Sequence, residues 1–142
     1  MDELKFAVIG NPVSHSLSPD IHLFFASQFQ LERYTYNKIK SNENDFERDI
    51  NDFFNNGGVG LNVTVPFKGL AYNLCDELDQ SAGLCKSVNT VLIDSGKLIG
   101  HSTDGQGLID DFLHKEITLE DSKILIIGAG GSAASIISSL LS

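Results

Sequence analysis

The stretch GVGLNVTVPFK, from Gly58 to Lys68, decides the fold because it holds a strand, the end of that strand and the start of a helix. Residues 59–65 alternate between apolar and polar side chains, as a strand with one buried face does, and Thr64 falls on the polar face. Pro66 lacks the N–H that a sheet ladder needs, so the strand ends before it. A helix then begins near Lys68, which is predicted to emerge at the carboxyl edge of a sheet.

The rest of the chain alternates between strands and helices in the same way. An apolar strand at 4–10 ends in turn residues, and Ser18 as N-cap with Pro19 at the first helical position predicts the next helix. That helix should have one apolar face, formed by Ile21, Phe24, Phe25 and Phe29. The further predicted elements are a strand at 33–39, helices at 45–54 and 68–78, a hairpin at 87–103 that turns at 94–96, and a helix at 104–116.

This order predicts an α/β fold with a mostly parallel mixed sheet flanked by helices. The first domain should span residues 1–105, and residues 106–120 should form a connecting helix and linker. Residues 121–142 should start a second domain of Rossmann type, with one strand buried on both faces at 123–128 and one helix.

A glycine-rich turn follows that last predicted strand. Gly128, Gly130 and Ala133 fit the G-x-G-x-x-G/A spacing, in which glycines allow a tight turn and close approach of a pyrophosphate to a helix N-terminus. The candidate cofactor-binding residues are Gly128, Ala129, Gly130, Gly131, Ser132 and Ala133. A tight turn without a ligand is the alternative. The residue that distinguishes NAD from NADP is expected about 20 positions further on, past Ser142.

The composition excludes several classes of function. A net charge of -9 disfavours nucleic acid as a partner, because such binding requires clustered cations. The start of the chain has no basic region and no long apolar run, so we expect no membrane partner and a cytoplasmic location. Cys75 and Cys85 form no metal-ligand motif, so we expect reduced thiols and no metal.

Polar residues follow the strands of the first domain. Ligands of open α/β sheets bind beyond the carboxyl ends of the strands, so these residues should converge. They are Ser14, Ser16, Ser18, Thr64, Lys68, Asn89, Thr103 and Asp104. Taken singly, each has a structural explanation, such as capping or solvation, but their joint placement favours a site for a polyhydroxylated, anionic small molecule.

The four histidines receive no catalytic role. His15 and His101 lie in predicted site loops, whereas His22 and His114 lie on predicted helices, where packing or exposure is expected.

The motifs together resemble the shikimate dehydrogenase family. GNPVSHSLSPDIH is similar to its substrate loop, NVTVPFK to its catalytic segment, SVNT and STDGQG to its later substrate motifs, and GAGG to its cofactor turn. The resemblance implies an NADP-dependent oxidoreductase that reduces 3-dehydroshikimate to shikimate in aromatic amino acid biosynthesis. It also implies that residues 1–105 are the substrate domain and that residues 121–142 begin the NADP-binding domain.

The resemblance also assigns roles to residues. Ser16 and Ser18 would bind the substrate carboxylate, and Thr64 and Asn89 would bond its ring hydroxyls. Lys68 and Asp104 would form the catalytic pair and also bind substrate. Departures from the family pattern are Gln80, Lys86, Ser87, Ser102 and Ala134, where relatives commonly have an acid, Gly, Ala, Asn and Arg.

Members of this family have two domains, and the given chain stops early in the second. We therefore interpret it as a fragment, predict that the 142 residues alone are inactive, and expect self-association through the incomplete second domain. The alternatives are a broader quinate/shikimate dehydrogenase, or a non-catalytic shikimate-binding module if the natural chain ends at Ser142.

Overall fold

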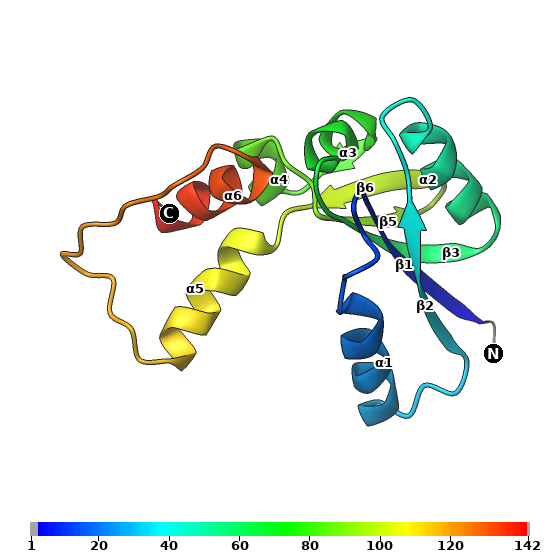
Figure 1. Ribbon diagram of the computed structural model, residues 1–142, viewed down its shortest axis with the longest axis horizontal. Helices are drawn as coiled ribbons and strands as arrows, with labels where there is room; N and C mark the ends of the chain where they lie inside the picture. Colours follow the sequence, from blue (N-terminus) through cyan, green and yellow to red (C-terminus); the bar gives the residue numbers. More distant parts are fainter. Residues whose placement is uncertain (1–2, 142) are drawn as a thin grey trace.

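The computed structural model describes residues 3–141, in which six strands and six helices are formed (Figure 1). In chain order they are β1 (Leu4–Gly10), α1 (Ser18–Gln28), β2 (Tyr34–Lys40), α2 (Phe46–Asn55), β3 (Gly58–Val63), α3 (Lys68–Leu74), β4 (Glu77–Leu78), α4 (Gln80–Cys85), β5 (Thr90–Asp94), β6 (Lys97–His101), α5 (Asp104–His114) and α6 (Gly131–Leu140).

The strands form one mixed sheet in the order β2-β1-β3-β5-β6-β4. β2, β1 and β3 are parallel, β5 is antiparallel to both of its neighbours, and β4 is parallel to β6. Ser95 and Gly96 join β5 to β6 and both have positive φ, which suits the twist of a two-residue hairpin. The predicted α/β class, with a parallel part and an antiparallel hairpin, is confirmed.

Alternation along β1 divides the core between the two faces of the sheet. Ala7 and Ile9 pack with residues of α2 and with Phe67 on one face, where Ile9 and Ile50 are fully buried. Val8 packs on the other face with Val13 and Tyr36. Successive side chains of a strand point to opposite faces, so this one strand supports both layers.

α1 differs from its prediction in two respects. Its N-cap is Leu17, and Ser18 is the first helical residue, so Ser18 does not cap the helix. Its predicted apolar face is also largely exposed, since Phe24 is 60% and Phe25 51% accessible, and Ala26 is the buried residue of the helix. The reason is geometric, because α1 covers only the β1–β2 end of the sheet and has a narrow contact there (Figure 1).

The predicted helix at 68–78 is shorter in the structure and is followed by elements that the sequence pattern did not indicate. α3 ends at Leu74, and Asp76 exchanges hydrogen bonds with Leu98: its backbone N–H donates to the Leu98 carbonyl at 2.9 Å, and its carboxylate accepts from the Leu98 N–H at 2.8 Å. These bonds align β4 with β6. Asp79 then caps α4 by accepting from the Ala82 N–H at 2.7 Å.

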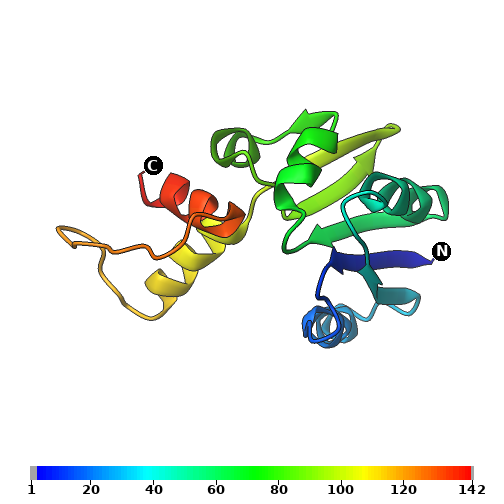
Figure 2. The ribbon, with the colours of Figure 1, turned by 45° about the horizontal axis from the view of Figure 1, so that its top comes forward.

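α5 and α6 lie side by side, away from the sheet (Figures 1 and 2). Gly105 allows their close approach, because a Cβ at this position would overlap Ser135 and Ser139. The buried Ser135 hydroxyl accepts from the Gly105 N–H at 3.0 Å and lies 2.8 Å from the Ser102 hydroxyl oxygen.

The strand predicted at 123–128 is not formed. This segment runs as an extended loop between α5 and α6 (Figure 1), and Leu125 and Ile127 are 83% and 91% exposed rather than buried on both faces. A strand requires a neighbour for its ladder, and within residues 3–141 the strands all belong to the one sheet formed by β1 to β6.

Candidate active site

The six residues predicted to bind substrate line one cavity of about 330 Å³ beyond the carboxyl ends of β1 and β3. They come from distant parts of the chain and are Ser16, Ser18, Thr64, Lys68, Asn89 and Asp104. Parallel neighbouring strands explain the convergence, since the loops that follow β1 and β3 leave the sheet at the same edge. Pro12, His15, His22 and Asn62 also line the cavity.

The strand-to-helix connection that presents Lys68 is fixed at several points. Strand pairing ends at Val63, two residues earlier than predicted, and the Thr64 N–H donates to the Ile9 carbonyl at 2.9 Å. The Phe67 N–H closes a turn on the Thr64 carbonyl at 3.0 Å, and the Phe67 side chain is 1% exposed. Lys68 is therefore the first residue of a helix whose entry is anchored in the core.

Lys68 and Asp104 form an ion pair at the starts of α3 and α5. The pair is largely shielded, with side chains 11% and 23% exposed, so its attraction is screened less than that of a surface pair. Ser132 joins it from α6: its Oγ accepts from Lys68 Nζ at 2.9 Å and donates to Asp104 Oδ2 at 3.1 Å.

Asn89 holds the other oxygen of Asp104. Its Nδ2 donates to Asp104 Oδ1 at 2.7 Å, and its Oδ1 accepts from the Thr103 N–H at 3.0 Å. The backbone of Asn89 is held as well, because its carbonyl accepts from the Val63 N–H at 2.8 Å. Hydrogen bonds to the backbone and to the side chain of Asn89 thus fix its amide beside the Asp104 carboxylate.

Ser16 and Ser18 lie next to each other in the lining of the same cavity. The Ser16 hydroxyl accepts from the Ser18 N–H at 3.2 Å and donates to the Ser18 hydroxyl at 3.1 Å. Two adjacent hydroxyls of this kind offer donors to an anionic oxygen. The cavity therefore combines two hydroxyls that can bind an anion with a lysine–carboxylate pair.

The structure also brings forward residues that the sequence pattern did not single out. His22 lines the cavity although it lies on a helix, and burial lowers its pKa. It stacks on Tyr36, with ring centroids 4.4 Å apart. His101, expected in a site loop, lies instead 3.4 Å from the carboxylate of Asp79 and outside the cavity lining. Contacts between side chains of different strands and helices cannot be predicted from the spacing of residues within one segment of the sequence.

The glycine-rich turn has a backbone shape that suits a phosphate group. Gly128 has φ of +130°, and an added Cβ at Gly128 or Gly130 would meet no atom within 4 Å, so the backbone is open to a ligand there. Gly131 is different, because a Cβ at this position would overlap the buried Ser87 hydroxyl. α6 starts at Gly131, so free N–H groups lie at the turn.

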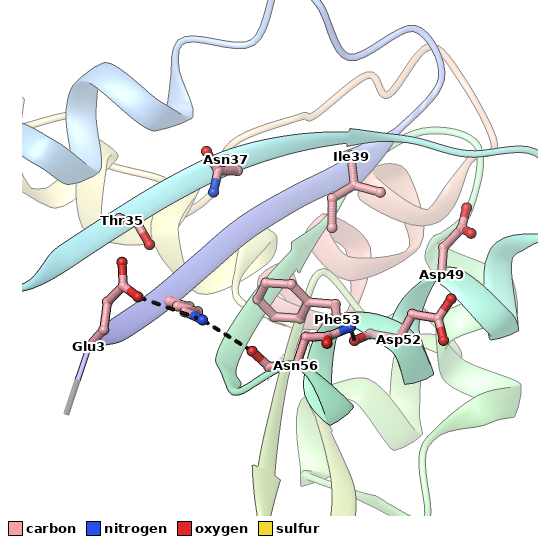
Figure 3. A pocket seen from close by; sticks show the side chains of 9 residues that line it. Glu3, Thr35, Asn37, Ile39, Asp49, Asp52, Phe53 and Asn56 are labelled. Atoms are coloured by element: carbon pink, nitrogen blue, oxygen red, sulfur yellow. Dashed lines mark hydrogen bonds and ion pairs between the residues drawn. The ribbon is translucent and has the colours of Figure 1, made fainter.

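A larger hollow of about 590 Å³ lies against β1, β2 and α2 (Figure 3). Its cation is already engaged, since Lys5 Nζ donates to the Asn56 carbonyl at 3.2 Å and lies 3.6 Å from the Glu3 carboxylate. Asp49 also has partners, in Ser41 and Arg48. None of the predicted site residues lines this hollow, so size alone does not mark the site.

Residues 3–141 contain neither a cluster of metal-ligating side chains nor a helix that could span a membrane. No group of three or more His, Cys, Asp or Glu side chains is placed to hold a metal ion. Across the same residues, no helix combines the length and the apolar character needed to cross a membrane.

Residues 8–91 match the family model described as the shikimate dehydrogenase substrate binding domain. The chain belongs to this family. The matched range includes five of the six predicted cavity residues, and Asp104 lies beyond it.

Curated relatives and solved structures agree with this family. The chain is 44% identical over 133 residues to shikimate dehydrogenase (NADP(+)) of Acinetobacter baylyi, covering 94% of this chain and 50% of the relative. It is 46% identical over 138 residues to the protein of the same name from Ruthia magnifica, covering 96% and 51%. The chain thus spans about half the length of the curated relatives it matches.

The structural match extends over almost the whole chain. The crystal structure of shikimate 5-dehydrogenase from Thermus thermophilus in complex with NADP(H) and shikimate has a TM-score of 0.90 and 32% identity, covering 97% of this chain and 52% of that chain. The fold of the described residues is therefore that of the corresponding part of this enzyme.

Proposed function

We propose that the protein containing this chain is an NADP-dependent shikimate dehydrogenase that interconverts 3-dehydroshikimate and shikimate on the route to aromatic amino acids. The observation that carries the proposal is the shielded Lys68–Asp104 pair in a polar cavity that also holds Asn89 and two facing serines. Family membership and the printed names of the relatives support it. In this proposal residues 1–105 form the substrate domain, 106–120 connect, and 121–142 begin the cofactor domain.

The substrate has one carboxylate and several ring oxygens, and the cavity offers groups of matching chemistry. Ser16 and Ser18 would donate to the carboxylate. Thr64 and Asn89, in the same lining, would bond the ring hydroxyls. Binding of the carboxylate and of the ring hydroxyls would fix the position of the reacting carbon–oxygen bond relative to Lys68.

Lys68 would act as the general acid in the direction of reduction. A ketone carbon that accepts a hydride develops negative charge on its oxygen, and an ammonium group within hydrogen-bond reach can protonate that oxygen as the charge forms. Lys68 would then be a neutral amine and regain a proton from solvent. Alcohol oxidation is the reverse, with the amine taking the hydroxyl proton. Asp104 would orient Lys68 and accept a hydrogen bond from the substrate.

The glycine-rich turn fits the pyrophosphate of a dinucleotide, because its backbone is open and a helix begins there. The residues that would hold it are Gly128, Ala129, Gly130, Gly131, Ser132 and Ala133. The bound nicotinamide dinucleotide would supply or accept the hydride. The preference for NADP follows from the relatives and is part of the proposal.

The test is Lys68→Ala in the complete gene product that contains this chain. We expect reduction of 3-dehydroshikimate by NADPH to fall by about 100-fold or more, since positioned acid–base groups contribute about 10²- to 10⁴-fold. Lys97→Ala is a matched control, because Lys97 also bonds a carboxylate, Glu77 at 2.6 Å, but on the exposed surface. Near-normal turnover by the Lys68 variant would refute the assignment.

Substrate and cofactor comparisons separate the related functions. Equal turnover of quinate and shikimate, or of NAD and NADP, would favour the broader dehydrogenase. A binding module would be favoured if the natural gene product binds shikimate without turnover and its measured mass shows that it ends at Ser142. Inactivity of the 142-residue chain, its self-association and a cytoplasmic location stay predictions.

A further inference from the structure

A buried tyrosine that lies outside the cavity lining is hydrogen-bonded to Asn62, which belongs to the lining. Tyr36 lies on β2 and is 5% exposed, and its hydroxyl donates to Asn62 Oδ1 at 2.7 Å. A phenol beside an amide oxygen has one good arrangement, with the phenol as donor. This bond therefore sets which end of the Asn62 amide faces Tyr36.

The other end of the Asn62 amide continues the hydrogen bonding toward the hairpin. Asn62 Nδ2 donates to Thr90 Oγ1 at 3.2 Å and approaches the Asn89 carbonyl at 3.4 Å. Thr90 has then accepted a bond and uses its own proton to donate to Asn89 Oδ1 at 3.1 Å. Each of these side chains accepts a hydrogen bond from the preceding one and donates a hydrogen bond to the next.

The last link reaches the candidate catalytic pair. With its oxygen occupied by Thr90 and by the Thr103 N–H, Asn89 points its Nδ2 at Asp104 Oδ1, at 2.7 Å. Asp104 Oδ2 is bonded to Lys68. The sequence of donors therefore runs in one direction, from Tyr36 through Asn62, Thr90 and Asn89 to Asp104.

We propose that Tyr36 is a positioning residue of the site: its phenol orients the Asn62 amide, and the hydrogen-bond chain that starts there supports the Asn89 amide, which the Thr103 N–H also holds, in its bond to Asp104. The proposal rests on the proposed function for its kinetic consequence. Tyr36 lies outside the cavity lining, so it acts through residues that do line the cavity, namely Asn62 and Ser18, rather than by touching substrate.

Two features keep Tyr36 in the donor role. Burial raises the pKa of Tyr36 to about 12, so the phenol keeps its proton over the range in which enzymes work. The His22 ring stacks on the tyrosine ring at an angle of 18°, which restricts its rotation. Without the hydroxyl, the Asn62 oxygen loses its donor, and only the contacts of Nδ2 with Thr90 Oγ1 and the Asn89 carbonyl, at 3.2 and 3.4 Å, still favour the present orientation of the amide. Hydrogen bonds in a chain also polarise one another, so one lost link weakens the others.

The experiment compares Tyr36→Phe with Tyr34→Phe in the complete gene product. Tyr34 is the matched control, two residues away on the same face of β2, with a hydroxyl that lies 3.4 Å from His22 Nδ1 and belongs to no link of the chain. We expect kcat for shikimate oxidation to fall about five-fold or more in Tyr36→Phe, because a buried acceptor is left without its donor. Tyr34→Phe should stay within about two-fold. Unchanged kcat in Tyr36→Phe would overturn the proposal.

A double variant tests the chain itself. Thr90→Val breaks a different link with a side chain of similar shape, so adding it to Tyr36→Phe should cost little beyond the larger single effect. A double variant whose loss equals the product of the two single losses would show independent effects and would contradict a connected chain.

A spectroscopic readout separates this proposal from the proposed function. The side-chain amide signals of Asn89, assigned with Asn89→Asp, should shift in the NMR spectrum of Tyr36→Phe and stay in place in Tyr34→Phe. This result is expected even if the wild-type protein does not oxidise shikimate, which would refute the proposed function alone. Unshifted Asn89 signals in Tyr36→Phe would overturn the positioning role.

Discussion

Ser132 Oγ lies 2.9 Å from Lys68 Nζ, so the first turn of α6 touches the candidate catalytic lysine. The same oxygen donates to Asp104 at 3.1 Å, which makes Ser132 a bridge between the two charged groups. The glycine-rich turn and the catalytic pair are therefore one connected structure, although the motifs are 64 residues apart in the chain.

The bridge predicts a modest kinetic role for Ser132. Ser132→Ala removes one hydrogen bond from each charged group while leaving the ion pair, so we expect kcat of the complete gene product to fall about three- to ten-fold. Ser122→Ala is the control, because the Ser122 hydroxyl donates to the Thr118 carbonyl at 3.3 Å, in the loop before the turn, and not to either charged group. Steady-state kinetics of the two variants check this, and equal kcat values would show that the bridge does not matter.

Ser87 is a buried residue whose hydroxyl has no hydrogen-bond partner among the described residues. It packs against Gly131. An unpaired buried hydroxyl costs about 1–3 kcal/mol, so Ser87→Ala should raise the free energy of unfolding by about 1 kcal/mol.

Ser102→Ala is the matched control for this prediction. Ser102 is also buried, but its hydroxyl oxygen lies 2.8 Å from that of Ser135, so its removal should destabilise the protein. Urea unfolding of both variants checks whether the free energy of unfolding rises for Ser87→Ala and falls for Ser102→Ala. A Ser87 variant that is less stable than the wild type would show that this hydroxyl has a partner.

The placement of Lys68 could be predicted because it depends on local rules. Strand alternation puts Thr64 on the polar face, Pro66 ends the ladder, and a helix can then start at Lys68. Convergence was predicted from the shared edge of the strands for eight polar residues, and six of them line one cavity, whereas Ser14 and Thr103 do not.

Features that depend on a partner across the fold were not predicted. Tyr36 looks like an ordinary strand residue, and only the pairing of β2 and β3 with β1 brings it to Asn62. β4 exists because Asp76 bonds Leu98, and residues 123–128 lack a strand because no described strand lies beside them. Local spacing contains no information about such neighbours.

Lys86 ends α4 with a left-handed backbone, at φ of +51°. This conformation favours glycine, which lacks the Cβ that makes positive φ unfavourable. Lys86→Gly should therefore stabilise the protein by about 0.5–1 kcal/mol. Lys115→Gly is the control, because Lys115 also ends a helix but has φ of -88° and bonds Asp111 at 2.6 Å, so it should lose stability. Thermal unfolding of both variants checks this, and two shifts of the same sign would contradict it.

Tyr36 should make the protein less stable at alkaline pH. Burial raises its pKa from 10.0 to about 12 in the folded state, while the unfolded chain keeps the ordinary value. Between these two values the unfolded state has lost the proton and the folded state has kept it, so the free energy of unfolding falls as pH rises. The slope is about 1.4 kcal/mol per pH unit from this one group, and the effect is absent below about pH 9.

Urea unfolding of the wild type and of Tyr36→Phe at about pH 8, 10 and 11 isolates the contribution of Tyr36, because the variant lacks the titrating phenol but shares every other alkaline transition. Parallel curves for the two proteins over this range would show that Tyr36 does not titrate differently on folding.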